Sequence, residues 1–286
     1  MTVIGGAGRM GSWFTKFLKS NGYHVIVSDR NIQAGRTCAR RLGIDFVSDY
    51  LVAAKTSDIV ILATPTNVSD RILKRLGREL QKGTLLVEIS TMKDPLRHTI
   101  SVLQKQGFPV LSIHPMFGSG TKNLEGRSIL VVSKTRHRMA TQLLAILRRL
   151  GARIVPCSID KHDILASILI ALPHLMSISL IETLRFLRVS MKDINRASGT
   201  TFRLHSLVAE SIYQEGFVNE ISILVGCKSS VLKAYNQQVR SILSIIRTNP
   251  EQLSDILNAG RRFVEDDTCF ADSYERFNAA VQAALL

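Results

Sequence analysis

Three glycines near the start of the chain have the spacing that phosphate binding requires. Gly6, Gly8 and Gly11 form the pattern G-x-G-x-x-G, which follows the apolar run Thr2–Ile4 and precedes a helical run. Glycines at these positions permit a sharp turn out of a strand, approach of a pyrophosphate to the backbone and close helix packing. The amides and positive dipole at the helix start attract phosphates. The stretch therefore predicts a dinucleotide-binding turn.

An acidic residue and its basic neighbour bear on which dinucleotide binds. Asp29 lies 18 residues past Gly11, at the end of the next apolar run, where its carboxylate can accept hydrogen bonds from a ribose diol. This favours NAD, because the carboxylate would repel the 2′-phosphate of NADP. Arg30 can pair with a 2′-phosphate, so NADP stays open. Arg9 and Met10, between the glycines, are expected to contact the cofactor too.

A histidine at the end of another apolar run has the chemistry of a general base. His114 closes the run Val110–His114, and the following Pro115 and Gly118 fix the exit direction and permit a turn. Imidazole is the side chain best suited to accept a proton near neutral pH. The sequence therefore offers His114 as a proton acceptor. A histidine that only caps the strand through a backbone hydrogen bond is the alternative.

Two other apolar runs are followed by groups that can contact a ligand. Thr64 and Pro65 close the apolar run Ile59–Thr64, and ligands lie at the carboxyl ends of parallel strands. We therefore expect both residues to border the nucleotide, with a plain loop turn as the alternative. Thr91 and Lys93 follow another apolar run and supply a hydroxyl and an amine at the same edge.

A long apolar helical stretch carries two more histidines. His174 lies inside it, where a histidine is either a satisfied core residue or a ligand-binding group. His162 and Asp163 open the stretch, and an N-terminal cap with a hydrogen-bonded pair is the simplest interpretation of them. No metal site is expected.

Alternating strand and helix signals in the first half predict the element that positions these groups. Apolar runs suited to buried parallel strands lie at Thr2–Ile4, His24–Ser28, Ile59–Thr64, Leu85–Ile89, Val110–His114 and Ile129–Ser133, with weaker candidates at Asp45–Val47 and Ala152–Cys157. Amphipathic helical runs lie between them at Ser12–Ser20, Ile32–Leu42, Val68–Leu80, Asp94–Gln106 and Arg138–Leu150. This alternation predicts an α/β fold with a Rossmann-type, doubly wound parallel sheet.

Strand signals stop at Ser158, and helical periodicity takes over. Candidate helices run over Lys161–Leu187, Phe202–Tyr213, Val218–Leu224, Ser230–Arg247, Glu251–Phe263 and Asp272–Ala284. The predicted domains are a dinucleotide-binding domain of residues 1–157 and an all-α domain of residues 158–286. Several apolar faces in the helical half favour a homodimer, with a self-contained helical core as the alternative.

The charge of the chain is concentrated in its first half. The net charge is +14, and residues 1–150 hold 23 Lys and Arg against 9 Asp and Glu. Such a field attracts an anionic cofactor and an anionic substrate. It would also bind nucleic acid nonspecifically, but no nucleic-acid motif is present, so no such partner is expected.

The chain is expected to be a cytoplasmic protein. Met1 leads directly into a strand without a secretory signal, and the four cysteines are scattered as in proteins with reduced thiols. The most apolar stretch, Ile164–Leu184, is interrupted by Pro173 and contains Glu182. We therefore expect a buried helix rather than a membrane span.

In combination, these motifs resemble those of the prephenate dehydrogenase family, which includes arogenate dehydrogenases. The matching motifs are G-G-x-G-x-M-G-x-W-F (Gly5–Phe14), T-x-K (Thr91–Lys93), H-P-M-F-G (His114–Gly118), the pair His162-Asp163, L-P-H (Leu172–His174) and Phe202-Arg203-Leu204. They occur in the family's order. The glycine motif together with H-P-M-F-G is fairly specific, whereas the short H-D and L-P-H matches are weak singly.

The resemblance implies an NAD(P)-dependent oxidative decarboxylation in tyrosine biosynthesis, in which prephenate becomes 4-hydroxyphenylpyruvate and CO₂. It implies that His114 accepts the hydroxyl proton and that Thr91 helps to orient His114 or the substrate. His174 and Arg203 match positions that line the substrate pocket. Arginine suits the two carboxylates of prephenate because it binds them bidentately.

The sequence departs from the family at two places. Many relatives have a serine at the position of Thr91, and threonine keeps the hydroxyl. Several relatives have a second arginine shortly after the position of Arg203, whereas the stretch Leu207–Ser211 has none. Lys93, Arg196 or a residue of a partner subunit is therefore expected to complete carboxylate recognition.

Three other functions are considered. Arogenate dehydrogenase has the same chemistry on a substrate with an amino group in place of the pyruvyl ketone, and the sequence barely separates the two. A 3-hydroxyacid dehydrogenase is expected to carry a lysine in its long interdomain helix, and the stretch Ile164–Leu184 has none. A dinucleotide sensor or nucleic-acid-binding protein would leave His114, Thr91 and Arg203 without a shared purpose.

Overall fold

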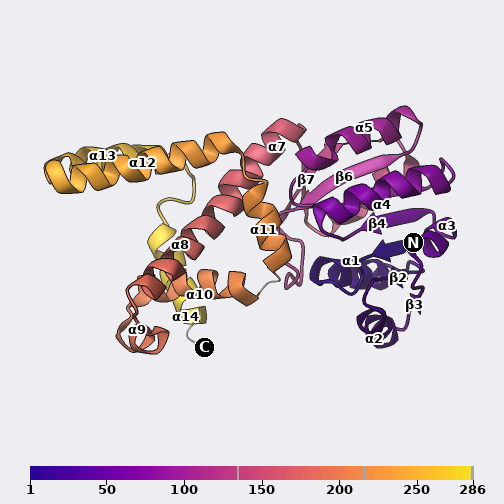
Figure 1. Ribbon diagram of the computed structural model, residues 1–286, viewed down its shortest axis with the longest axis horizontal. Helices are drawn as coiled ribbons and strands as arrows, with labels where there is room; N and C mark the ends of the chain where they lie inside the picture. Colours follow the sequence, from indigo (N-terminus) through magenta and orange to yellow (C-terminus); the bar gives the residue numbers. More distant parts are fainter. Residues whose placement is uncertain (134, 215–216, 285–286) are drawn as a thin grey trace. The chain divides into compact units, whose positions relative to one another are not determined.

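The chain forms two compact units, Met1–Ala166 and Ser167–Leu286. The computed structural model, drawn in Figure 1, describes residues 1–133, 135–214 and 217–284. The sequence placed a domain boundary after residue 157, and helix α7 (Ile159–Ala166) then belongs to the first unit in the structure. It does so because it packs against strand β7 and the 3-10 turn Asp94–Leu96.

The first unit is built on an eight-stranded sheet with the order β3-β2-β1-β4-β5-β6-β7-β8. The strands are β1 (Thr2–Ile4), β2 (Ile26–Ser28), β3 (Asp45–Phe46), β4 (Ile59–Leu62), β5 (Leu85–Glu88), β6 (Val110–Pro115), β7 (Ser128–Ser133) and β8 (Arg153–Pro156). Every neighbouring pair is parallel except β6 and β7. The predicted Rossmann-type sheet is thereby confirmed.

The direction of β7 is a correction to the sequence analysis. Ile129–Ser133 was expected to be a parallel strand, but β7 runs antiparallel to β6. A parallel neighbour requires a crossover, usually a helix, and no helix lies between these two strands. The chain therefore reverses through the loop after Pro115 and returns along the edge of β6.

Helices cover both faces of the sheet. They are α1 (Arg9–Ser20), α2 (Ile32–Leu42), α3 (Tyr50–Lys55), α4 (Thr66–Glu79), α5 (Arg97–Lys105), α6 (Arg138–Arg149) and α7. Local signals set their ends. The Asn31 side chain accepts the Ala34 amide at the start of α2, and Gly43, with φ 61°, ends this helix. Asp49 caps α3, a helix that the sequence analysis did not predict.

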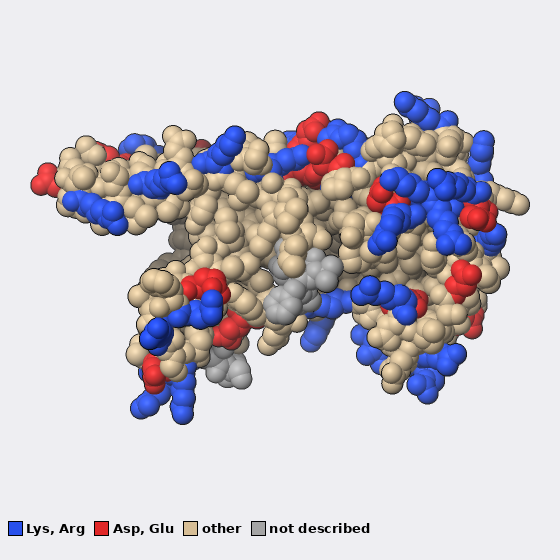
Figure 2. Space-filling view, viewed as in Figure 1, with Lys and Arg blue, Asp and Glu red and all other residues tan. Residues whose placement is uncertain are grey.

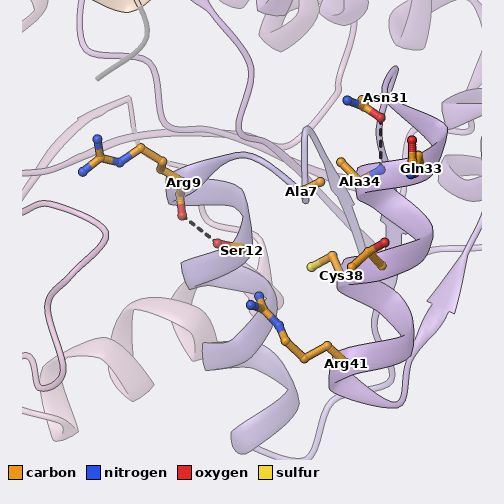
Figure 3. A pocket seen from close by; sticks show the side chains of 9 residues that line it. Ala7, Arg9, Ser12, Asn31, Gln33, Ala34, Cys38 and Arg41 are labelled. Carbon is orange, nitrogen blue, oxygen red and sulfur yellow. Dashed lines mark hydrogen bonds between the residues drawn. The ribbon is translucent and has the colours of Figure 1, made fainter. Parts of the chain in front are cut away.

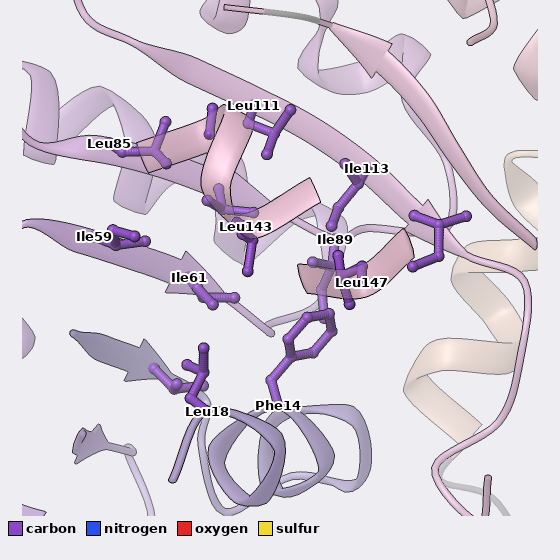
Figure 4. Packing of buried hydrophobic residues seen from close by; sticks show 14 of the residues in the cluster. Phe14, Leu18, Ile59, Ile61, Leu85, Ile89, Leu111, Ile113, Leu143 and Leu147 are labelled. Carbon is purple, nitrogen blue, oxygen red and sulfur yellow. The ribbon is translucent and has the colours of Figure 1, made fainter. Parts of the chain in front are cut away.

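Strand residues alternate between two apolar cores. Val3 and Ile61 point to the face covered by α1 and α6, whereas Ile4 and Leu62 point to the face covered by α4 and α5. Figure 4 shows the first core, in which Phe14 of α1 points toward Leu147 of α6 on the same face of the sheet. Both faces are thus buried, which is why the strands are nearly continuous apolar runs.

The second unit is helical throughout its described residues, which confirms the all-α prediction. Its helices are α8 (Leu172–Phe186), α9 (Met191–Ala197), α10 (Thr200–Gln214), α11 (Phe217–Val225), α12 (Ser229–Thr248), α13 (Leu253–Val264) and α14 (Ser273–Ala284). A π-helical turn, Ser167–Ala171, precedes α8. Pro173 lies in the first turn of α8 and has no amide to donate, which disturbs the helical ladder there. Helix α8 packs against α10 and α11.

The long apolar helix is less covered than expected. Among the described residues, Ile159–Phe186 is long and apolar enough to cross a membrane, and 22% of its most apolar window is buried. Helix α8 holds no fully buried residue, and Met176 and Phe186 are 48% and 86% exposed. The prediction of a buried helix is therefore wrong for the single chain, because only part of its circumference packs against other helices.

Candidate active site

The glycine turn between β1 and α1 is shaped by close backbone contacts. Gly5 has φ 76°, and a Cβ there would lie 2.5 Å from the Ala63 carbonyl oxygen. A Cβ on Gly11 would lie 2.0 Å from the Gly5 carbonyl oxygen, so only glycine lets α1 approach the turn. The sequence analysis assigned the sharp turn to Gly6. The structure places the positive φ at Gly5 instead.

The start of α1 is open to an anion. Its N-cap residue, Gly8, provides no side-chain hydrogen bond to the first turn. Helix starts without such a cap present amides and a positive dipole to phosphates. Arg9 and Met10 are the first two residues of this helix, so the structure places both of them at the predicted phosphate site.

Asp29 ties the end of β2 to the glycine turn. Its Oδ2 accepts the Ala7 amide at 3.1 Å and its Oδ1 accepts the Asn31 amide at 2.9 Å. A carboxylate oxygen can accept more than one hydrogen bond, so Asp29 keeps acceptor capacity for a ribose diol. Arg30, beside it, is exposed.

An open cavity of about 520 Å³ lies beside this turn. Figure 3 shows its lining residues, which are Ala7, Arg9, Ser12, Asn31, Gln33, Ala34, Thr37, Cys38 and Arg41. Two guanidinium groups and no carboxylate line it, which suits a phosphate ligand. Arg41, on α2, was missed in the sequence analysis. Its position on the helix that follows Asp29 is the signal that could have found it.

Positive charge also covers other parts of the first unit. Figure 2 shows Lys and Arg side chains gathered over α4, where Arg71, Lys74, Arg75 and Arg78 are exposed. The predicted excess of positive charge in residues 1–150 therefore lies on the surface, where it can attract anionic ligands over distances of about 10 Å.

Thr64 and Pro65 lie beside the glycine turn at the end of β4. The Thr64 methyl group would be 3.0 Å from a Cβ on Gly5. The Thr64 hydroxyl bonds the Ser69 hydroxyl at 2.8 Å, and Pro65 is the N-cap residue of α4. The carboxyl ends of β1 and β4 thus bring these residues and the turn together.

A hydrogen-bonded series of three buried side chains ends at His114. Nδ1 of His114 lies 2.9 Å from Nε2 of His162, and Nδ1 of His162 lies 2.7 Å from Oδ1 of Asp163. The Lys93 amide donates to Oδ1 of Asp163 at 3.0 Å, and the Asp94 amide donates to Oδ2 at 2.9 Å. His114, His162 and Asp163 are 5%, 0% and 1% exposed. This hydrogen-bonded series connects β6 to α7.

The sequence analysis expected His162 and Asp163 to cap the start of α7, but neither residue does so. The Ser158 hydroxyl accepts the Lys161 amide at 3.3 Å, and the His162 amide bonds the Ser158 carbonyl at 2.8 Å. Ser158 therefore holds the helix start. The hydrogen-bonded pair that the sequence analysis also expected is present, and its second partner is His114.

Lys93 has internal partners. Its side chain is 0% exposed, and its Nζ donates to Oε1 of Glu88 and to the Ile113 carbonyl, each at 2.7 Å. The Ser112 hydroxyl also bonds the Glu88 carboxylate. The sequence analysis predicted a contact between Lys93 and a substrate carboxylate. The structure instead places the ammonium group in a buried ion pair beneath β6.

The surroundings of His114 keep its ring neutral. Burial, the ammonium group of Lys93 and the His162 ring together hold the pKa of His114 well below its ordinary value. Among the described residues, Nδ1 is hydrogen-bonded and Nε2 has no hydrogen-bond partner. A neutral ring with one nitrogen held is the form that a general base requires.

The pKa values of two charged groups near His114 are also shifted from their ordinary values. Burial lowers the pKa of Lys93, and the Glu88 carboxylate opposes this shift. Burial by itself would raise the pKa of Asp163, but hydrogen bonds from His162 and from two backbone amides hold it below its ordinary value. Asp163 is therefore a carboxylate at neutral pH.

The remaining predicted residues make no hydrogen bond with His114 within the described residues. Thr91 makes no hydrogen bond within the described residues, so the group that holds His114 is His162 rather than Thr91. His174 and Arg203 belong to the second unit. His174 is partly buried on α8, and exposed Arg203 on α10 donates to the Asn195 carbonyl at 3.1 Å.

Comparisons of the sequence with known proteins find prephenate and arogenate dehydrogenases among its relatives. The sequence model of the nucleotide-binding domain of prephenate dehydrogenase matches residues 14–155. A probable arogenate/prephenate dehydrogenase of Methanocaldococcus jannaschii is 28% identical over 261 residues, which are 90% of this chain and 56% of that protein. This chain spans about half the length of the curated relatives that it matches first.

Solved structures show the same fold. Prephenate dehydrogenase of A. aeolicus, crystallised with hydroxyphenyl propionate and NAD⁺, has a TM-score of 0.73 at 20% identity, covering 93% of this chain and 98% of that one. Arogenate dehydrogenase of Synechocystis has a TM-score of 0.63 at 21% identity, covering 91% and 98%. The solved structures show the fold, and the match of residues 14–155 to the family model, together with the similar curated relatives, identifies the nucleotide-binding region of this chain as a member of the prephenate/arogenate dehydrogenase family.

Proposed function

We propose that this chain converts prephenate to 4-hydroxyphenylpyruvate and CO₂ with a nicotinamide dinucleotide, and that His114 accepts the proton of the substrate hydroxyl. The state of His114 carries the proposal: its ring is neutral, Nδ1 is held by His162, and Nε2 has no partner among the described residues. Removal of the hydroxyl proton lets the ring carbon that carries the hydroxyl group release hydride. Loss of CO₂ then leaves an aromatic ring, which makes the step favourable.

The turn after β1 supports dinucleotide binding. The uncapped start of α1 and the guanidinium groups of Arg9 and Arg41 suit a pyrophosphate. When bound, the nicotinamide supplies the hydride acceptor. Asp29 favours NAD as the cofactor, and Arg30 makes NADP the second candidate. The residues assigned to cofactor binding are Gly6, Gly8, Arg9, Met10, Gly11, Asp29, Arg30, Thr64 and Pro65.

Three residues are assigned to substrate contacts. Prephenate carries two carboxylates, and Arg203 presents an exposed guanidinium group that suits one of them. His174 is also assigned to a substrate contact. Thr91 is assigned to a contact with the substrate, since its hydroxyl makes no hydrogen bond within the described residues. Lys93 is left out of this proposal because its ammonium group is bound to Glu88.

Arogenate is the second candidate substrate. It undergoes the same oxidation and decarboxylation, and the proton acceptor and hydride acceptor would have the same roles. The relative from Methanocaldococcus jannaschii is described by both substrates, and the structural neighbour from Synechocystis is an arogenate dehydrogenase. These names support keeping both substrates in every assay.

A homodimer is proposed for the second unit. Ile246 of α12 and Leu257 and Phe263 of α13 are 51%, 71% and 82% exposed, which is unusual for apolar side chains of this size. A second copy that covers these helices and the open side of α8 would bury them. We propose a soluble, cytoplasmic dimer, in which the apolar helix Ile159–Phe186 lies inside the assembly rather than in a membrane.

The test is an assay of reduced nicotinamide by its absorbance, with prephenate and arogenate each paired with NAD and NADP. Turnover with prephenate and a preference for NAD are expected. Turnover with arogenate alone would move the function to the second candidate. If none of the four pairs reacts while a nicotinamide dinucleotide still binds by fluorescence titration, the proposed activity is wrong.

A further inference from the structure

The buried chain from His114 to Asp163 contains a histidine that the proposed reaction does not yet use. His162 stands between the proposed base and a carboxylate, with both ring nitrogens within hydrogen-bond distance of a partner. All three side chains are at least 95% buried. A buried polar group whose hydrogen bonds are all made, as for both nitrogens of His162, fixes one arrangement of its partners.

The protonation of this chain follows from its donors and acceptors. Asp163 accepts the amides of Lys93 and Asp94, one on each oxygen, so it binds as a carboxylate. It can therefore only accept from Nδ1 of His162, which places a proton on that nitrogen. A neutral His162 then offers a lone pair at Nε2. His114 must donate its Nδ1 proton to that lone pair, which leaves Nε2 of His114 as the base.

We infer that His162 and Asp163 are positioning residues that fix His114 in the tautomer with the proton on Nδ1, and that they share the positive charge after proton transfer. The inference rests on the proposed function, because it concerns the same base. It assigns these two residues no contact with substrate or cofactor. The opposite arrangement, a cationic His162 that donates to His114, would put the remaining proton on Nε2 and block the base.

Charge in the cluster favours the first arrangement. Lys93 and Glu88 form a buried pair of opposite charges. We call the three bonded side chains together with Lys93 and Glu88 the buried cluster. When both of its histidines are neutral, the carboxylate of Asp163 gives this cluster one net negative charge. A proton that arrives at His114 brings the cluster to neutrality, so the negative charge stabilises the product of proton transfer in advance. The Cys157 thiol also lies within electrostatic reach of Asp163, and Lys161 lies within reach of Cys157.

The proton can be followed through the step. It leaves the substrate hydroxyl and binds Nε2 of His114, while the proton on Nδ1 of His114 moves toward Nε2 of His162. Nδ1 of His162 keeps its proton and its bond to Asp163, which stays unprotonated, as in the aspartate–histidine pair of serine proteases. The electron pair of the broken carbon–hydrogen bond goes to the nicotinamide as hydride. The electron pair of the broken carbon–carboxylate bond enters the ring as CO₂ leaves, which makes the ring oxygen a phenolate. This oxygen takes the proton back from Nε2 of His114, so the phenol of the product forms and His114 is neutral again.

Nitrogen-15 NMR of the histidine-labelled full chain tests the tautomer without turnover. Spectra are taken at about pH 8, above the ordinary histidine pKa of about 6.5. Signals of the seven histidines are assigned with the variants His114→Gln and His162→Gln. We expect a protonated Nδ1 and an unprotonated Nε2 for His114. A protonated Nε2, or an equal mixture of both tautomers, would overturn the inference.

Kinetics of variants separate positioning from a purely structural role. His162→Leu removes the acceptor and is expected to lower kcat about 100-fold with KM nearly unchanged. His162→Gln keeps an acceptor near the position of Nε2 and is expected to recover part of this loss. Asp163→Asn is expected to lower kcat and to mix the His114 tautomers in the NMR spectrum. Equal losses in Leu and Gln variants, or a loss in KM alone, would contradict positioning.

Two control variants match these changes. Asp160→Asn removes an exposed carboxylate of the same helix, which pairs with Arg97. His137→Gln removes a histidine at the start of α6, outside the cluster. Both are expected to keep wild-type kcat. If the wild-type chain oxidises neither prephenate nor arogenate, the proposed function fails, yet the NMR result on His114 still decides the inference.

Discussion

Nε2 of His162 lies 2.9 Å from Nδ1 of His114, although 48 residues separate them in the chain. The contact joins the last residues of β6 to the first helix after the sheet. It leaves one nitrogen of His114 without a partner among the described residues. The structure thereby distinguishes the two nitrogens of the proposed base.

Replacing the base tests the proposed proton transfer directly. The variant His114→Asn is expected to lower kcat by about 10²–10⁴-fold, because general-base catalysis contributes a factor of that size. The affinity for NAD, measured by fluorescence titration, is expected to stay unchanged, since the glycine turn is untouched. His137→Gln is the matched control. Activity near the wild-type level in His114→Asn would show that another group accepts the proton.

The adjacent residues Asp29 and Arg30, with opposite charges, are expected to set the cofactor preference. Hydrogen bonds to a charged group contribute about 1.5–3 kcal/mol. Asp29→Ser should therefore lower the ratio of kcat/KM for NAD to that for NADP by about 10–100-fold, and Arg30→Ala should raise it. Because Asp29 also accepts the Ala7 and Asn31 amides, thermal unfolding must be measured beside the kinetics. An unchanged ratio in both variants would place cofactor selection elsewhere.

The buried ion pair makes a prediction about stability. Lys93→Met removes the partner of the Glu88 carboxylate, and an uncompensated buried charge costs about 3–5 kcal/mol. The free energy of unfolding, from urea titration, should fall by about that amount. The double variant Glu88→Gln with Lys93→Met should lose less than the sum of the single losses. Additive losses would mean that the two groups do not interact.

The lowered pKa of His114 predicts how stability depends on pH. Because the folded pKa lies below that of the unfolded chain, the unfolded state binds more protons between the two values. This contribution is fully present above about pH 6.5 and is lost as the pH falls toward the folded pKa. The unfolding temperature of wild type should therefore drop below about pH 6.5 more steeply than that of His114→Asn. Parallel curves would contradict the shift.

The same shift predicts the acid limb of the activity profile. Protonation of His114 stops the base, so kcat/KM should stay level down to about pH 6.5 and fall only below it. Wild type and the control Asp160→Asn should show the same profile. A fall centred above about pH 6.5 would mean that another group controls the acid limb.

The proposed dimer can be tested by mass. Light scattering at micromolar concentration is expected to give twice the chain mass. Leu257→Asp with Phe263→Asp, at two exposed positions of α13, should shift the mass to a monomer. Val52→Asp, at a position of α3 that is 54% exposed in the first unit, is the control. A monomeric wild type would reject the dimer.

The sequence alone determined the fold class and much of the local design. Apolar runs, amphipathic periods and capping residues act over a few neighbours, so strands, helices and the glycine turn could be predicted from them. The turn, Asp29 and His114 were proposed as functional because each follows an apolar run in the sequence. Helix α3 was not predicted, because it is only six residues long.

Only the tertiary structure decided what the buried polar groups bind. The direction of β7, the pairing of Lys93 with Glu88 and the contact between His114 and His162 all depend on segments far apart in the sequence. No local period encodes such partners, since burial by the whole sheet and α7 determines which donor meets which acceptor. The sequence therefore supplied candidate residues for a base and a cofactor site, and packing decided which nitrogen of His114 is held.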